Sequence, residues 1–144
     1  MSQVFGNGEW LNGGGPGTGP APFLIYDKSS SIVSPAKTFV FVDEHPNSIN
    51  DAAFAVQCQG AWTTDPIYGE RIIDFPASFH NGACGFSFAD GHSEIHKWKG
   101  GAIKQPAVYP ASMPAPRTLQ LNVSANPDSG RDVRWMAENS TVKR

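Results

Sequence analysis

Glycine and proline interrupt this chain too often for long helices or wide regular sheets. Residues 6–22 contain seven glycines and three prolines in 17 positions. The 144 residues contain 15 glycines and 12 prolines in all, nearly a fifth of the chain, against an average of about 12% for the two together. Because both residues end regular elements, we expect short strands joined by turns and long loops, with little helix.

The size and composition of the chain fit one packed domain. Divided in two, 144 residues would give two marginal cores. Nine Phe, four Trp and three Tyr residues can fill a single core, since apolar residues make up 40% of the chain. We expect an α+β, mainly β fold with an antiparallel sheet. Residues 1–22 are predicted to form a Gly/Pro-rich arm or loop, and residues 23–144 a single globular domain.

Charge and hydropathy argue against nucleic-acid and membrane partners. Eleven Lys and Arg residues stand against thirteen Asp and Glu residues, a net charge of −2, so no basic excess exists to neutralise a phosphate backbone. No run of about 18 apolar residues is present to span a bilayer. The first residues lack the charged and apolar regions of a signal peptide. We expect no nucleic-acid binding and no membrane insertion by this chain.

The clearest strand pattern covers residues 38–42, which are β-branched or aromatic throughout. Asp43, Glu44 and His45 follow directly. Pro46 then lacks the N–H that a strand ladder needs. Ionisable side chains are therefore expected at the carboxyl end of this strand.

A hairpin is predicted where Asp90 and Gly91 separate residues 84–89 from residues 92–98, because Asp-Gly suits the positive φ angles of a two-residue turn. A loop of two residues sends two sets of side chains to opposite faces of the hairpin. The apolar, core-directed set is Phe86, Phe88 and Ile95. The polar set is His92, Glu94 and His96.

Acids and imidazoles recur at these strand ends and turns. They are Asp43, Glu44, His45, His80, Asp90 and His92. Such mixed nitrogen and oxygen donors suit a divalent cation, zinc where imidazoles lead and calcium where oxygens do. The ordinary alternative is that Asp90 only forms the turn and His92 is solvated. We hypothesise a structural network in which His80 packs against Asp90 and Asp43.

Two further function classes are open on these residues. A metal-dependent hydrolase could use Asp43, His80, Asp90 and His92, but no serine stands in a G-x-S-x-G elbow, so we predict that the chain is not an enzyme. A carbohydrate-binding module would use aromatic residues such as Trp62, Trp98 and Trp135, which otherwise pack. 

The cysteines leave two alternatives. Cys58 and Cys84 form no C-x-x-C pair. They predict either one disulfide in an oxidising compartment or two buried thiols.

Several segments together resemble the H-x9-DG prepilin-like proteins of planctomycete and verrucomicrobial genomes. Residues 34–51 resemble the strand and acidic turn of that family. His80, Asp90 and Gly91 match its signature, with nine residues between His80 and Asp90. Asp132 and Trp135 match its C-terminal Asp-x-x-Trp segment. The resemblance covers roughly residues 5–140.

The resemblance implies a pseudopilin-like headgroup of the type II secretion or type IV pilin kind, in the cell envelope, the periplasm or outside the cell. It implies a structural role through self-association or packing against other pilin-like subunits. The sequence lacks the family's Gly-Phe-Thr-Leu-like start and its apolar N-terminal helix, so we expect a soluble headgroup without that helix. The resemblance also implies that acidic turns hold a cation.

Overall fold

The computed structural model describes residues 1–15, 17–59, 71–107 and 119–144. Its elements in chain order are η1 (Gln3–Phe5), η2 (Ser29–Ser31), η3 (Pro35–Lys37), β1 (Phe39–Val42), β2 (Arg71–Ile72), β3 (Ala83–Phe88), β4 (Ser93–Lys97), β5 (Leu119–Gln120) and α1 (Pro127–Glu138). The three η elements are single turns of 3-10 helix.

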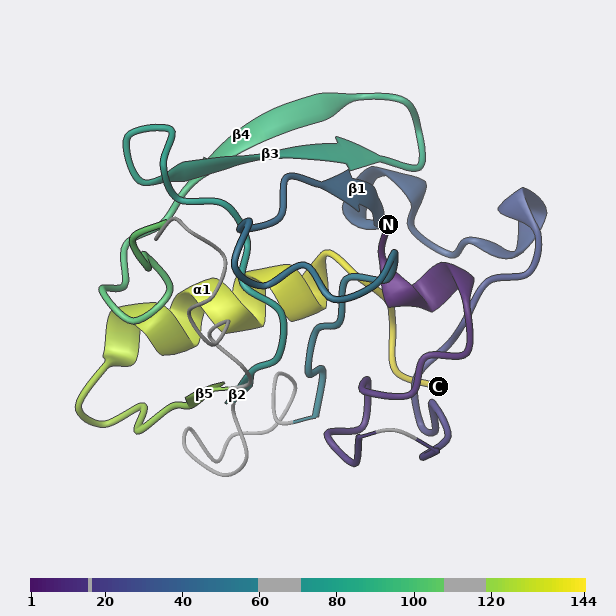
Figure 1. The fold of residues 1–144 in the computed structure, drawn as a ribbon. Helices are drawn as coiled ribbons and strands as arrows, with labels where there is room; N and C mark the ends of the chain where they lie inside the picture. Colours follow the sequence, from purple (N-terminus) through teal and green to yellow (C-terminus); the bar gives the residue numbers. More distant parts are fainter. Residues whose placement is uncertain (16, 60–70, 108–118) are drawn as a thin grey trace.

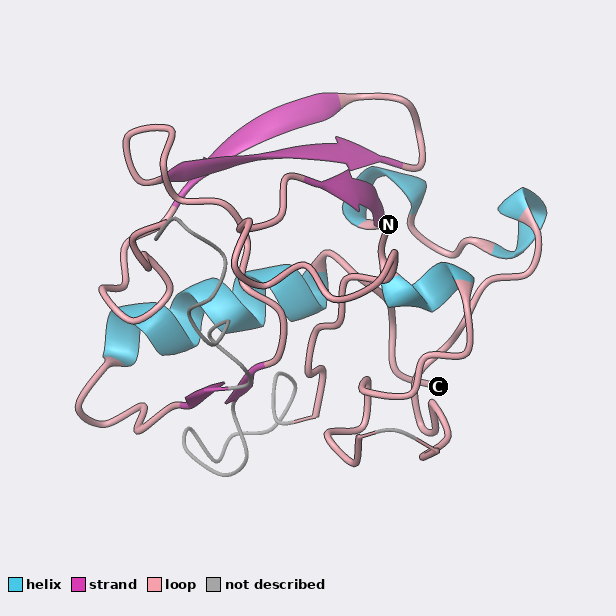
Figure 2. Ribbon diagram, in the orientation of Figure 1, coloured by secondary structure: helices cyan, strands magenta, loops and turns pink. Residues whose placement is uncertain are grey.

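Two antiparallel sheets and one helix make up the described fold, which confirms the predicted α+β class. β3 lies between β1 and β4 in a three-stranded sheet, and β2 pairs with β5 in a second, smaller sheet. In Figure 1, α1 crosses below the three-stranded sheet, and β2 and β5 lie lower still. Loops connect these short elements (Figure 2), as the glycine and proline content predicts. No helix among the described residues is long and apolar enough to cross a bilayer.

The predicted hairpin exists, but its predicted register is wrong by one residue. Gly91 donates its N–H to the carbonyl of Phe88 (3.0 Å), and Phe88 donates its own to the carbonyl of His92 (2.9 Å). The loop therefore contains three residues, 89–91. Gly91 closes it at φ +94°, a left-handed conformation that glycine adopts without a steric penalty.

The extra loop residue changes which side chains share a face. Phe86 lies opposite Glu94, and Cys84 opposite His96, so the even-numbered residues of both strands face the core side together. Ile95, predicted in the core, lies opposite Gly85 on the outer face and is 80% exposed. The predicted polar set of His92, Glu94 and His96 lies on the inner face instead.

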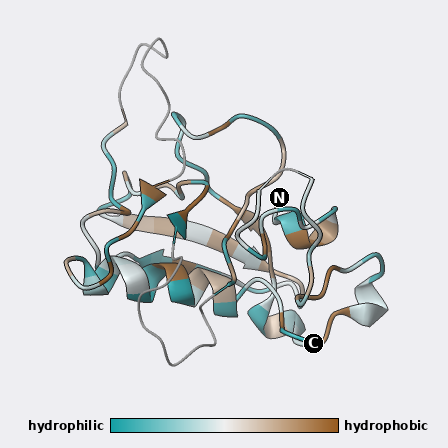
Figure 3. Cartoon of the chain, turned by 90° about the horizontal axis from the view of Figure 1, so that it is seen from below, coloured by the Kyte–Doolittle hydropathy of each residue, from teal (hydrophilic) through white to brown (hydrophobic). Residues whose placement is uncertain are grey.

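The C-terminal helix α1 is the longest regular element among the described residues. It begins at Pro127, five residues before Asp132. Proline suits the first helical position because its missing N–H has no partner there in any case. Asp128 in the first turn adds a favourable charge at the helix N-terminus. Hydrophilic and hydrophobic positions alternate along α1 (Figure 3), as in a helix with one apolar face. Val133 and Met136 are three residues apart and are both buried.

Aromatic side chains join the sheet to the helix. The Phe86 ring on β3 lies 5.3 Å from Phe39 on β1, 5.9 Å from Trp98 and 5.0 Å from Trp135 on α1, measured between ring centroids. All three pairs have the edge-to-face geometry that aromatic rings prefer. Residues 1–22 are mostly turns, yet Val4 and Leu11 lie fully buried in the same core.

Replacing Phe86 with alanine should destabilise the domain by about 3–5 kcal/mol, because a ring at the centre of this cluster leaves a cavity. Urea unfolding followed by tryptophan fluorescence measures the change. Phe41→Ala is the matched control. The Phe41 ring lies on the neighbouring strand but is 58% exposed, so its loss should cost less than about 0.5 kcal/mol. Equal losses for both variants would contradict the placement of the core.

Candidate functional site

The six predicted site residues do not converge on one site, although four of them form two separate pairs. The His80 ring pairs with Asp43, with Nε2 3.1 Å from Oδ2, whereas the Asp90 carboxylate pairs with His92, with Oδ1 2.6 Å from Nδ1. Asp43 lies beside Gly85 on β3, since its N–H donates to the Gly85 carbonyl. Asp90 lies beyond Phe88, about 10 Å further along the strand. The hypothesis that His80 packs against Asp90 is therefore wrong.

Both pairs lie at the surface. The side chains are 62% and 44% exposed for His80 and Asp43, and 41% and 37% exposed for His92 and Asp90. The hydrogen bond from His92 lowers the pKa of Asp90. Solvent screens ion pairs this exposed, and they contribute little to stability, so neither of them can hold the sheet together.

His45 stabilises the fold through hydrogen bonds to the backbone, and its ring nitrogens do not point to a metal site among the described residues. The side chain is fully buried. Its Nδ1 accepts the N–H of Asn47 (3.2 Å), and its Nε2 lies 3.2 Å from the carbonyl oxygen of Gln105. Nε2 must therefore carry the proton and donate it. Nδ1 stabilises the local turn, and Nε2 joins that turn to a loop 60 residues further along the chain.

Glu44 lies near two other carboxyl groups, Asp74 and Asp51. Burial and the charge of Asp74 raise the pKa of Glu44 to about 7, although a hydrogen bond from Ser48 and the N-terminal ammonium act in the opposite direction. Burial also raises the pKa of Asp74 to about 6, against the hydrogen bond that its Oδ2 accepts from the N–H of Ala55 at 2.6 Å. Both pKa values are raised because ionisation would place like charges close together at a site that is partly removed from water.

Asp74 was missed in the sequence. It stands between Ile73 and Phe75 in an apolar run, and an acid in such a run is a signal of a buried carboxyl group. Asp74 and Asp51 help to line a pocket of about 900 Å³, together with Glu9 and the Trp10 ring.

The described residues contain no group of three or more His, Cys, Asp or Glu side chains placed to hold a metal ion. The bound cation, calcium or zinc, and the metal-dependent hydrolase therefore stay predictions. Cys58 and Cys84 are free and buried. The structure therefore matches the prediction of two buried thiols and not that of a disulfide. Burial raises the pKa of both thiols, that of Cys84 to about 12.

The aromatic residues considered for sugar binding do not form a surface patch in the described part of the chain. Trp98 is buried, and its Nε1 donates to the carbonyl of Ala77 (2.8 Å). Trp135 packs in the core-facing cluster. Trp62 lies outside the described residues. The carbohydrate-binding alternative stays a prediction without support from these rings.

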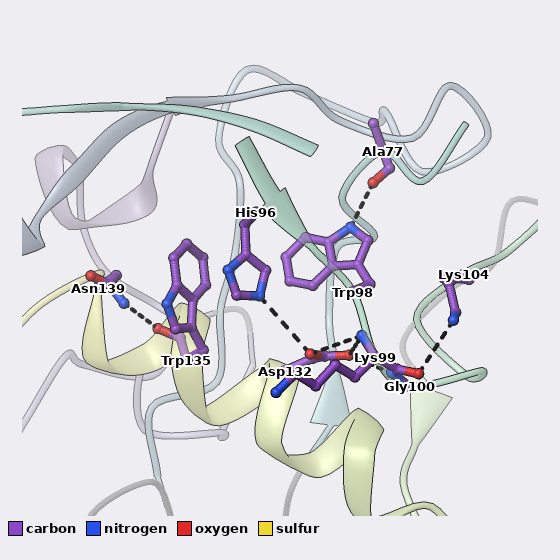
Figure 4. Close-up of polar contacts among 9 residues, drawn as sticks. All are labelled: Ala77, His96, Trp98, Lys99, Gly100, Lys104, Asp132, Trp135 and Asn139. Carbon is purple, nitrogen blue, oxygen red and sulfur yellow. Dashed lines mark hydrogen bonds and ion pairs between the residues drawn. The ribbon is translucent and has the colours of Figure 1, made fainter. Parts of the chain in front are cut away.

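The best-developed polar arrangement is centred on Asp132, a residue that is only 3% exposed. Its carboxylate accepts the N–H groups of Lys99 (3.0 Å) and Gly100 (2.7 Å) from the loop that follows β4 (Figure 4). A Cβ atom at Gly100 would lie 2.3 Å from the Cα of Ser129. Glycine is therefore required for the loop to approach α1 closely enough to be held.

His96 lies above the Asp132 carboxylate, between two tryptophan rings (Figure 4). It stacks on Trp135 with centroids 3.7 Å apart and lies 4.7 Å from Trp98. Its Nε2 is 4.0 Å from the Asp132 carboxylate. The arrangement couples β4 to α1 through stacked rings, so its geometry suits docking of the helix better than catalysis.

Comparison with protein-family models, curated proteins and solved structures finds no match to this chain. The resemblance to the H-x9-DG prepilin-like family therefore stays a prediction based on the sequence motifs.

Raising the pH should weaken the fold through Glu44 and Asp74. The pKa values of both carboxyl groups are raised in the folded chain, to about 7 and about 6, so the folded chain binds their protons more tightly than the unfolded chain does. The free energy of unfolding then falls as the pH rises from about 4.5 to about 7.

The Glu44→Gln variant removes one of these groups, so its melting temperature should fall less than that of the wild type over this pH range. Glu94→Gln, at an exposed carboxyl group on β4, is the control and should follow the wild type. Parallel curves for wild type and Glu44→Gln would show that the acidic group does not titrate in this way.

Replacing Asp132 with alanine should cost about 1–3 kcal/mol, because it leaves buried N–H donors without an acceptor. Chemical denaturation measures the loss. Glu138→Ala removes an exposed acid from the same helix and should change stability by less than about 0.5 kcal/mol. If Asp132→Ala is as stable as Glu138→Ala, the hydrogen bonds of the Asp132 carboxylate do not stabilise the fold.

Proposed function

We propose that this chain is the head domain of a pilin-like subunit in a cell-envelope or extracellular filament. It acts by packing against copies of itself or against other pilin-like subunits, without catalysing a reaction. The H-x9-DG and Asp-x-x-Trp motifs of the sequence suggest this role, and the surface of the three-stranded sheet supports it.

The observation that carries the proposal is a shallow groove on the outer face of this sheet. Gly85 and Ser87 of β3 form its floor, and the exposed side chains of Phe41 and Ile95 line it on either side. The groove has a volume of about 600 Å³. Large apolar side chains flanking small ones on an exposed face are typical of an interaction surface.

The polar groups of the described residues favour the same function. The two His–Asp pairs are exposed and lie apart, and His45 uses both ring nitrogens in hydrogen bonds to the backbone. Such groups stabilise turns and loops, whereas catalysis requires that several of them converge on one substrate position.

The proposal predicts concentration-dependent association of the purified chain, measured by sedimentation velocity. Phe41→Ser should weaken the association by at least about tenfold, because the buried phenylalanine ring contributes about 1.5–3 kcal/mol. Val33→Ser removes an equally exposed apolar side chain that does not line the groove, and it should associate like the wild type. A chain that stays monomeric at millimolar concentration would refute packing against copies of itself.

A further inference from the structure

β4 is an edge strand among the described residues, since it pairs only with β3. In Figure 1 it runs along the upper rim of the molecule. Its pairing with β3 contains no register shift, and its five residues include no proline. Bulges, prolines and charged side chains are means by which proteins stop an edge strand from pairing with another chain. β4 has no bulge and no proline, but it carries Glu94 and Lys97, so the position of these charges decides which pairing is allowed.

The hydrogen bonds of the hairpin show which backbone groups of β4 are free to pair. His92 bonds to Phe88, and Trp98 bonds to Gly82, in each case across the hairpin at 2.9 Å. Because bonded and non-bonded residues alternate along an antiparallel pair, the even-numbered residues of β4 bond to β3. The N–H and C=O groups of Ser93, Ile95 and Lys97 therefore point toward the free edge.

The sequence of β4 is complementary to itself when it is reversed. In an antiparallel pair of two β4 strands centred on Ile95, Glu94 of each copy lies opposite His96 of the other, and Ser93 lies opposite Lys97. No like charges lie directly opposite each other. Cross-strand pairs of this kind stabilise sheets, whereas like charges destabilise them.

We propose that two copies of this chain associate through β4, in an antiparallel pair whose two-fold axis passes between the two Ile95 residues. This inference rests on the proposed self-association and adds a second contact with its own symmetry, at the sheet edge beside the groove. The pair forms about six backbone hydrogen bonds, two for each of its three outward-facing residue pairs. It joins the three-stranded sheets of the two copies into one and places the Ile95 side chains, each 80% exposed in the single chain, against each other.

Other registers of the same two strands are worse. Centring the pair on Glu94 places two carboxylates opposite each other, and centring it on Lys97 does the same with two ammonium groups. Centring it on Ser93 or His96 leaves outward-facing backbone groups of β4 beyond the end of the partner strand. Only the Ile95 register uses the outward groups of all three residues, places Glu94 opposite His96 and keeps like charges from facing each other.

Cysteine cross-linking of the whole chain tests the register. In the proposed pair, the Cα atoms at position 95 lie about 5.5 Å apart, within the range of about 4.4–6.8 Å that a disulfide allows. The Cα atoms at position 97 lie about 13 Å apart. Ile95→Cys should therefore form a disulfide dimer under mild oxidation at least about tenfold faster than the exposed control Lys97→Cys, because pairing raises the effective thiol concentration. The native thiols add little background, since Cys58 and Cys84 are buried.

A mixture of Ser93→Cys and Lys97→Cys provides the second measurement. These positions lie opposite each other in the proposed register, so in an equal mixture the mixed dimers should exceed each homodimer by far more than the twofold ratio that random pairing gives, as mass spectrometry can measure. Equal cross-linking rates for Ile95→Cys and Lys97→Cys in a chain that associates would overturn the edge pairing but leave the proposed function in place. A wild-type chain that does not associate in sedimentation overturns both the edge pairing and packing against copies of itself.

Discussion

The attachment of one helix to one small sheet is the constraint on which this fold depends. Asp132 holds the backbone after β4, and Trp135 packs against His96 and Phe86 in the same region. A three-stranded sheet alone buries too little apolar area to offset the entropy of ordering long loops. The helix supplies the missing surface, and the buried carboxylate fixes its position through directional hydrogen bonds that apolar contacts cannot provide.

Local residue patterns predicted the elements of the fold, but not how they face each other. The alternation of β-branched and aromatic residues gave β1, and Asp90 with Gly91 gave the hairpin, because these signals act within a few residues. Whether the turn contains two residues or three is decided by small differences in loop geometry. That single residue moved Ile95 to the outer face and His96 to the inner one, so the predicted faces of β4 were wrong.

The candidate site was harder to predict because spacing in sequence is not proximity in space. The nine residues between His80 and Asp90 contain all of β3, and an extended strand separates its two ends. Each residue therefore pairs with a local partner, His80 with Asp43 and Asp90 with His92. Asp132 was visible in the sequence, but its role depends on a loop more than 30 residues away, which no local pattern shows.

The three-residue turn at Gly91 also has a consequence for how such a chain can diverge. Insertion or deletion of one residue there would rotate β4 by half a turn, hide Ile95 and bring two imidazoles and a carboxylate to the outer face. The surface chemistry of the hairpin would change without any substitution in the strand. Turn length, more than strand composition, would then govern which chains of this architecture recognise one another.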